Sequence, residues 1–126
     1  APELNKNIFD LGIPIQGHCY GHQLIAHVLG GKVTNGNKSE YGIATIDIKD
    51  KSTIFKNLNN KEQVWMSHGD EVTQLPKGFE IIASTDDCSV AAMANEEKHI
   101  YGYQFHPEVT HTKHGQIILE NFLDIC

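Results

Sequence analysis

The stretch IPIQGHCYGHQLIAHVLGG, residues 13–31, decides the fold. Its apolar start, 13–15, is typical of a short buried strand. Apolar residues at helical spacing come after the cysteine and end at two glycines, and they are Leu24, Ile25, Val28 and Leu29. Between strand and helix, residues 17–21 have the form G-x-C-x-G around Cys19. This order predicts a sharp strand-to-helix turn that presents the cysteine.

The glycines of this turn have a mechanical reason. A strand that reverses directly into a helix forces its central residue into strained dihedral angles, and side chains on the neighbours would collide. Cys19 would then lie at the positive end of the helix, where a thiolate is favoured and backbone N–H groups can hold an oxyanion. The turn therefore predicts a nucleophile, and the alternative is a small buried thiol with no chemistry.

The rest of the chain predicts one compact α/β domain. Residues 2–12 have the pattern of an amphipathic helix that ends at Gly12. Strand-like segments follow at 44–48, 63–67, 79–84, 89–94 and 99–105. Residues 110–126 carry an apolar stripe typical of a closing helix, made of Ile118, Phe122 and Ile125. Strands framed by helices favour three layers.

Composition narrows the class of protein. The 126 residues suit one domain, and 10 Lys+Arg against 16 Asp+Glu give a net charge of -6. This charge works against nucleic-acid binding, and no apolar run is long enough for a membrane span. The three cysteines, at 19, 88 and 126, form no disulfide framework. We therefore expect a cytoplasmic protein in a reducing compartment.

A thiol nucleophile needs a base, and the segment YQFHPEV, residues 103–109, offers one. In an extended backbone, His106 and Glu108 lie on the same side, so the carboxylate can orient one imidazole nitrogen while the other faces the sulfur. Pro107 stiffens this presentation. Cys19, His106 and Glu108 are therefore the predicted catalytic triad, whereas an isolated H-x-E is more often a solvated surface pair.

Eight histidines raise a metal-binding module as the rival hypothesis. His18 and His22 have the i, i+4 spacing of metal ligands, and His111 and His114 are three apart. No C-x-x-C or H-E-x-x-H completes a site, so we expect no metal and place His22 at the helix start, where it costs little. A thiol redox module is a third interpretation, but it leaves the His-Pro-Glu pair without a role.

Three segments together resemble the class I (triad) glutamine amidotransferases, and most closely the branch that serves glutamine-hydrolysing GMP synthetase. They are GHCYGHQLIAHVLGGKV, VWMSHGDEV and YGYQFHPEVTHTKHGQIILENFLDIC. The segments that resemble the sequences of that branch in particular are MSHGDEV and HPEVTHT, which lie inside the second and third segments, and MANEEK, which lies between them. Other branches, which feed ammonia to carbamoyl phosphate, CTP or anthranilate synthesis, remain the alternatives within the family.

The resemblance implies a fold and a reaction. The fold is a three-layer sandwich with a mixed, largely parallel central sheet. The reaction is hydrolysis of glutamine to glutamate and ammonia through a Cys19 thioester, with His106 and Glu108 as base and orienting acid. The implied substrate contacts are Tyr20, through its N–H at the oxyanion, Gln23, and a loop that contributes Ser67, Gly69 and Asp70.

The resemblance also implies partners and a longer protein. Residues 1–126 would be the C-terminal two thirds of the amidotransferase domain, truncated at its N-terminus. An ATP-pyrophosphatase synthetase domain or subunit outside this chain would use ATP and Mg²⁺ to aminate XMP in purine biosynthesis, and would carry any homodimer contact. The glutaminase reaction itself needs no cofactor. His18 and Gln16 depart from the family, which generally has apolar residues at these positions.

Overall fold

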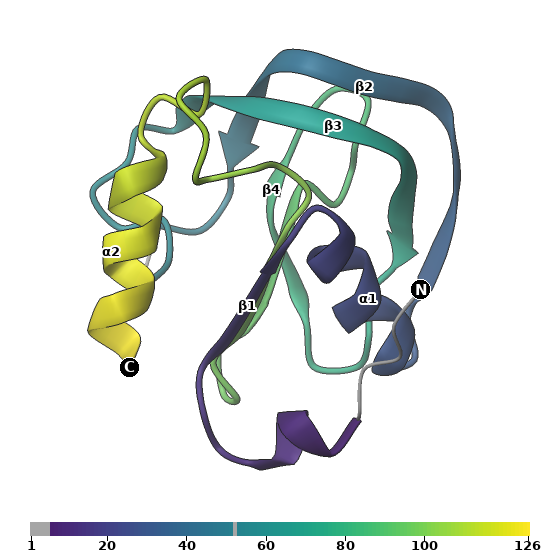
Figure 1. The fold of residues 1–126 in the computed structure, drawn as a ribbon, viewed down its shortest axis with the longest axis vertical. Coiled ribbons are helices and arrows are strands. Elements are labelled where there is room, and N and C mark those ends of the chain that lie inside the picture. Colours follow the sequence, from purple (N-terminus) through teal and green to yellow (C-terminus); the bar gives the residue numbers. More distant parts are fainter. Residues whose placement is uncertain (1–5, 52) are drawn as a thin grey trace.

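The computed structural model describes residues 6–51 and 53–126 (Figure 1). In chain order the elements are η1 (Lys6–Asp10), β1 (Ile15–His18), α1 (Tyr20–Val28), β2 (Lys32–Ile48), β3 (Lys61–Gln74), β4 (Glu80–Ser84), β5 (Ala92–Asn95), β6 (Ile100–Tyr103) and α2 (Gly115–Ile125). None of the helices in these ranges is long and apolar enough to cross a membrane.

The six strands described form one mixed sheet in the order β1-β6-β5-β4-β2-β3. Only β1 and β6 pair in parallel, and the other four pairings are antiparallel. The α/β class and the mixed sheet are confirmed, but a largely parallel sheet is wrong for these strands. Parallel neighbours need a long crossover, whereas β5 and β6 are joined by a tight turn over residues 96–99.

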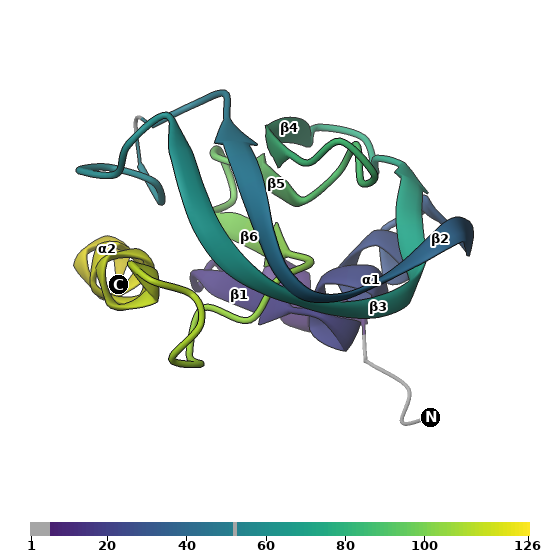
Figure 2. The ribbon, with the colours of Figure 1, turned by 90° about the horizontal axis from the view of Figure 1, so that it is seen from above.

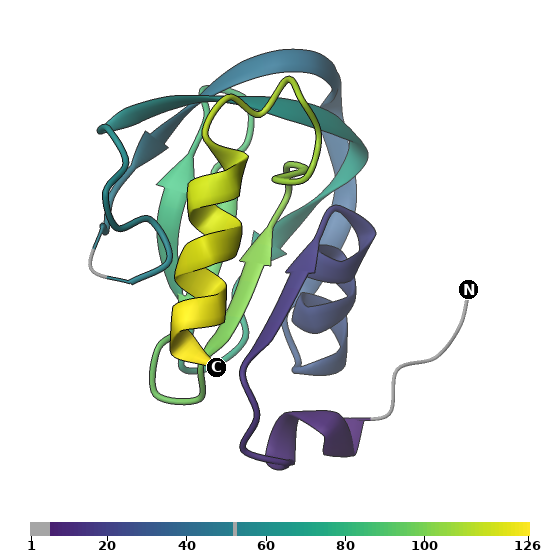
Figure 3. The same cartoon turned by 60° about the vertical axis from the view of Figure 1, so that its left-hand side comes forward.

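The two helices cover opposite faces of the sheet, which confirms the three layers. Side chains alternate along β5, so Met93 packs in one cluster with Ile25 of α1, while Ala92 packs in the other with Ile118 of α2. Figure 3 shows α1 and α2 on the two sides of β1 and β6. The predicted stripe on α2 is also confirmed, because Phe122 and Ile125 pack against the second cluster.

The long β2–β3 hairpin lies across one end of this core. It runs over the end of β1 and the start of α1 (Figures 1 and 2). Its pairing register shifts between Asn35 and Glu40, which allows the ribbon to bend. A segment that is distant in the chain from the G-x-C-x-G turn is thereby placed directly above it.

The start of the chain differs from its prediction. Of the helix expected over residues 2–12, residues 2–5 lie outside the described part, and residues 6–10 form a short 3-10 helix, η1. Phe9 is buried and Leu11 is exposed. The expected apolar face depended on the 3.6-residue spacing of an α-helix, which a 3-10 turn does not have. Gly12 has φ +74°, as predicted for a left-handed cap.

His22 lies in the core and not at a tolerant helix surface. Its side chain is 0% exposed, and neither ring nitrogen makes a hydrogen bond of ordinary geometry to the described residues. The ring fills the space beside Gly102, where a Cβ would lie 2.6 Å from Nδ1. The expectation that His22 costs little is therefore wrong, since a polar ring is buried without a hydrogen bond of ordinary geometry.

Acid is expected to destabilise the fold through His22. Burial lowers the pKa of His22 to about 4, with His68 adding to the shift and the backbone of Val90 and Gly102 opposing it. The unfolded chain, with a pKa of about 6.5, then binds the proton first. Stability should be full above about pH 6.5, and about 3 kcal/mol should be lost as the pH falls toward 4.

Urea unfolding at pH 7 and pH 4.5 measures this loss. In His22→Leu the free energy of unfolding should depend less on pH, because leucine binds no proton in either state and the contribution of His22 is removed. His27→Ala, which removes an exposed histidine of the same helix, is the control and should retain the wild-type dependence. Equal pH dependence in wild type and His22→Leu would contradict the prediction.

Candidate functional site

The strand-to-helix turn forms as predicted. Cys19 is the N-cap of α1 with φ 54° and ψ -112°, and its N–H donates to the Tyr103 carbonyl at 2.8 Å. A Cβ on Gly17 would lie 2.8 Å from the carbonyl carbon and oxygen of Gly21, so this position accepts only glycine. A Cβ on Gly21 would meet nothing within 4 Å. The steric reason therefore holds for the first glycine and not for the second.

Burial sets the acidity of the Cys19 thiol. The half-buried Sγ donates to the Ser67 carbonyl at 3.3 Å. Burial raises the pKa of Cys19 above its ordinary value, the Tyr20 N–H opposes this rise, and the negative charge of Glu108 adds to it. The helix start was expected to lower the pKa of the thiol, and the Tyr20 N–H does so, but burial raises the pKa by more. A base must therefore remove the thiol proton.

The parallel pairing of β1 and β6 brings the segments that carry Cys19 and His106 to the same edge of the sheet. His18 is opposite Tyr103 in the register, so the residues that follow each strand, Cys19 and His106, emerge at the same edge of the sheet. His106 Nδ1 lies 3.2 Å from Glu108 Oε2, as predicted for an imidazole oriented by a carboxylate. The side-chain pairing of these two residues is confirmed.

A second set of contacts holds the backbone of His106. Its N–H donates to the Trp65 carbonyl of β3 at 3.1 Å, and its carbonyl accepts from the Thr112 hydroxyl. The same hydroxyl accepts from the Trp65 N–H at 3.0 Å. Thr112 is buried and joins the His106 segment to the hairpin. Sequence reasoning missed it, because only the tertiary fold brings residues 65, 106 and 112 together.

Glu108 stands between two histidines. Its Oε2 contacts His106, and its Oε1 lies 3.8 Å from His18 Nδ1. Burial alone would raise the pKa of Glu108, but its own backbone N–H, His18 and His106 together hold it below the ordinary value. The carboxylate is therefore ionised at neutral pH.

The two departures at β1 now have physical accounts. The His18 ring lies edge-on to His106, with ring centroids 5.8 Å apart, and it borders Glu108 from the solvent side. Gln16 Oε1 accepts a hydrogen bond from the Tyr103 hydroxyl of β6 at 3.1 Å. Each polar side chain on β1 thus has a polar neighbour on β6 or just beyond it.

A cavity of about 270 Å³ opens at Cys19. Its lining includes every residue that was expected to contact substrate, namely Tyr20, Gln23, Ser67, Gly69 and Asp70, together with Cys19 itself. Tyr41 of β2 and His68 of β3 complete the lining and were not predicted. The hairpin that carries them reaches the turn only through the tertiary fold.

The SHGD segment was expected to be a loop, and this is wrong. Residues 67–70 lie inside β3, opposite β2. Burial alternates along the strand through Val64, Met66 and His68, so the strand period continues past the end of the predicted strand at residue 67. The sequence does not carry this alternation, because residues 64–66 are all apolar and residues 67–71 are polar or glycine. Ser67 and Asp70 present their backbone carbonyls to α1 from the strand.

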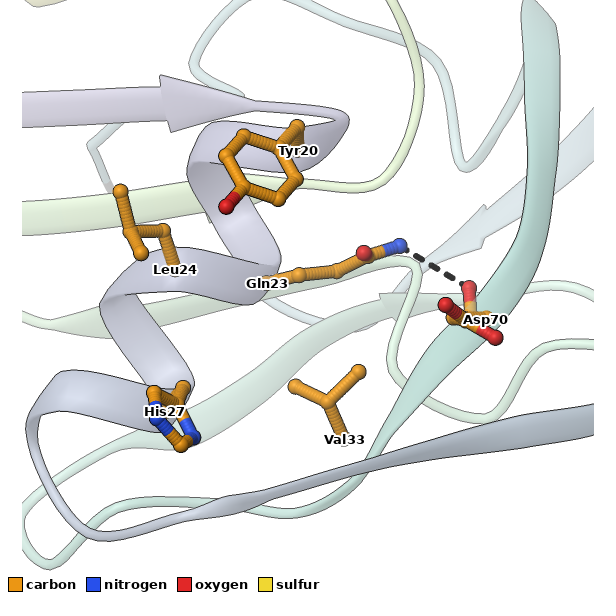
Figure 4. A pocket seen from close by; sticks show the side chains of 6 residues that line it. All are labelled: Tyr20, Gln23, Leu24, His27, Val33 and Asp70. Carbon is orange, nitrogen blue, oxygen red and sulfur yellow. Dashed lines mark hydrogen bonds between the residues drawn. The ribbon is translucent and has the colours of Figure 1, made fainter. Parts of the chain in front are cut away.

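Gln23 joins α1 to the hairpin and to the segment that follows β6. Its Nε2 donates to the Asp70 carbonyl at 2.9 Å, as Figure 4 shows, and to Gln104 Oε1 at 3.1 Å. Gln104 is completely buried, and its Nε2 has no partner among the described residues. A smaller cavity, of about 190 Å³, shares Tyr20, Gln23 and Asp70 with the first and is lined in addition by Leu24, His27 and Val33, the residues that Figure 4 draws.

The histidine pairs proposed as metal ligands do not form sites. His22 is buried against Gly102, whereas His18 lies at the surface beside Glu108. His114 Nδ1 contacts Glu62 Oε1 at 2.6 Å, and the His111 ring lies against Trp65 with ring centroids 5.1 Å apart. These contacts account for His111 and His114 without a shared ion.

The comparisons with known proteins agree with this geometry. A family model described as "Glutamine amidotransferase class-I" matches residues 1–126. A GMP synthase [glutamine-hydrolyzing] of Clostridium botulinum strain Hall is 53% identical over 127 residues, which is 100% of this chain and 25% of the relative. The protein of the same name from Clostridium novyi is 57% identical over 123 residues, with 98% and 24% covered.

Solved structures show the same fold. A protein from Thermoplasma acidophilum, described as a GMP synthase component, superposes with a TM-score of 0.92 at 38% identity, covering 96% of this chain and 61% of that one. A glutamine amidotransferase of Thermotoga maritima gives a TM-score of 0.77 at 25% identity, with 95% and 49% covered. The chain spans about a quarter of the length of the curated relatives it matches.

Proposed function

Because the chain belongs to the class-I glutamine amidotransferase family, we propose that it hydrolyses glutamine to glutamate and ammonia with Cys19 as the nucleophile. The observation that carries the proposal is the cavity in which Cys19 meets all five expected substrate contacts. The base, His106, is held at the same edge of the sheet by β6 and the hairpin.

The reaction begins with the thiol. At rest the raised pKa of Cys19 keeps the proton on the thiol. His106 takes this proton, and the sulfur attacks the side-chain amide carbon of glutamine. The C=O electrons move to oxygen, and the Tyr20 N–H at the start of α1 donates to that oxyanion. Glu108 stabilises the imidazolium through Nδ1.

The intermediate collapses with loss of ammonia. The C–N bond breaks, His106 returns its proton to the leaving nitrogen, and a glutamyl thioester remains on Cys19. His106 then takes a proton from water, whose oxygen attacks the thioester, and the thiol is restored as glutamate leaves. Each step uses residues of this chain and no metal or organic cofactor.

The remaining substrate contacts follow from the lining of the cavity. The Gln23 amide, held by Asp70 and Gln104, faces the cavity one helical turn from Cys19. Ser67, Gly69 and Asp70 line the opposite wall from β3 and would meet the α-amino and α-carboxylate groups of glutamine, largely through backbone atoms. A rigid strand holds such groups more precisely than a loop does.

The ammonia is proposed to serve amination of XMP to GMP in purine biosynthesis. The names of the relatives support this branch over those of carbamoyl phosphate, CTP or anthranilate synthesis. An ATP-pyrophosphatase synthetase domain or subunit, with ATP and Mg²⁺ and any homodimer contact, would make up much of the remaining length of such proteins. Residues 1–126 would be the amidotransferase part, acting in the cytoplasm.

Covalent labelling tests the nucleophile. A chloroketone analogue of glutamine should label one thiol per chain, mapped by peptide mass to Cys19, and free glutamine should slow the labelling. The exposed Cys126 is the internal control, since it should react with iodoacetamide but not selectively with the analogue. Labelling of Cys88 or Cys126 without protection by glutamine would contradict the proposal.

A separate assay tests the branch that the ammonia serves. In the full-length protein, glutamine-dependent ATP consumption should require XMP and not UTP.

A further inference from the structure

One cluster of side chains at the site is richer in ligand atoms than the proposed hydrolysis requires. His18, His106 and Glu108 each present a ligand atom, and these atoms lie within 4.8 Å of one another. No other group of three such residues occurs in the part of the chain that the structure describes. Only two of its members, His106 and Glu108, have a role in the proposed mechanism.

The donor set selects a class of ion. Two imidazole nitrogens and one carboxylate oxygen are ligands of zinc and of similar divalent transition metals, whereas Mg²⁺ and Ca²⁺ prefer oxygen alone. Bonds of about 2.0–2.2 Å place ligand atoms about 3.5 Å apart in a tetrahedral site. His18 Nδ1 and Glu108 Oε1 are already 3.8 Å apart, and His106 Nδ1 and Glu108 Oε2 are 3.2 Å apart.

The cluster is open to an incoming ion. His18 and His106 are partly exposed and Glu108 is exposed, so an ion can reach all three from solvent. One carboxylate oxygen lies toward each ring, so Glu108 is already within reach of both imidazoles. Three protein ligands leave a fourth position for water.

We propose that His18, His106 and Glu108 form an inhibitory site for a zinc-class divalent ion. This inference rests on the proposed function, because its consequence is the loss of the base. An ion on His106 Nδ1 replaces the proton that this nitrogen donates to Glu108, so the neutral ring carries its remaining proton on Nε2, and a positive charge lies beside it. His106 can then neither accept the Cys19 proton nor be oriented by Glu108, and hydrolysis stops.

His18 decides whether the site exists. It is the one ligand outside the proposed catalytic machinery, and it stands where the family generally carries an apolar residue. His18→Ile therefore removes a ligand while leaving Cys19, His106 and Glu108 in place. His18→Asn is the second variant, which keeps a polar group of similar reach in case isoleucine disturbs β1.

Calorimetry with Zn²⁺ alone, followed by the glutaminase assay, tests the inference on the full-length protein. Wild type should bind one ion, lose turnover in proportion to occupancy, and recover with EDTA. His18→Ile and His18→Asn should bind at least about tenfold more weakly and resist inhibition by the same factor. His27→Ala, which removes an exposed histidine one element away, should behave as wild type.

A further variant separates this site from a thiolate site. Cys19→Ala should bind Zn²⁺ with unchanged affinity, because the sulfur is not in the ligand set. Loss of binding in Cys19→Ala with retention in both His18 variants would overturn the inference. Calorimetry reports binding whether or not glutamine is hydrolysed, so failure of the proposed function leaves this result readable on its own.

Discussion

Cys19→Ala is expected to lower glutamate release from glutamine by about 10³-fold or more. The variant removes the only thiol among the described residues that line the cavity. Without a thioester, the remaining donors can only polarise the amide, and water must attack directly. The measurement is the steady-state rate of glutamate formation with saturating glutamine in the full-length protein.

Two controls accompany this variant. Cys126→Ala changes an exposed cysteine at the end of α2 and should retain the wild-type rate. Unfolding by urea should show that Cys19→Ala keeps most of the wild-type stability, since the thiol donates only one hydrogen bond, to Ser67. A Cys19→Ala protein that folds and turns over within tenfold of wild type would refute the nucleophile assignment.

Gly115→Ala is expected to destabilise the protein by on the order of 4 kcal/mol or more, or to prevent folding. A Cβ on Gly115 would lie 1.8 Å from the Pro107 carbonyl oxygen and 2.8 Å from its carbonyl carbon. Both are backbone atoms, so no side-chain rotation relieves the clash, and either α2 or the Pro107 segment must move. Because Pro107 joins His106 to Glu108, turnover should fall together with stability.

Gly21→Ala is the matched control for this change. Gly21 also stands in the first turn of a helix, α1, but its Cβ would meet nothing within 4 Å. Its stability should rise by about 0.5–1 kcal/mol, because alanine loses less entropy than glycine in a helix. Urea unfolding measures both variants. A Gly115→Ala protein as stable as Gly21→Ala would show that α2 does not press on the Pro107 backbone.

The strand-to-helix turn and the His-Pro-Glu step could be predicted because local physics decides them. Apolar spacing selects strand or helix within a few residues, and Gly17 is required by the backbone of Gly21, four residues away. The strand at residues 67–70 could not be predicted in this way, because residues 67–71 are polar or glycine and carry no apolar alternation. The sequence by itself thus determined the nucleophile candidate, its base and most of the cavity lining.

The tertiary structure alone decided what these parts meet. The burial of His22 depends on Gly102, and the support of His106 by Thr112 and Trp65 joins three distant segments. The pairing of His18 with Glu108 follows from the parallel register of β1 and β6, which no local pattern specifies. Contacts between segments tens of residues apart depend on the packing of the whole sheet, and for this reason spacing along the chain could not predict them.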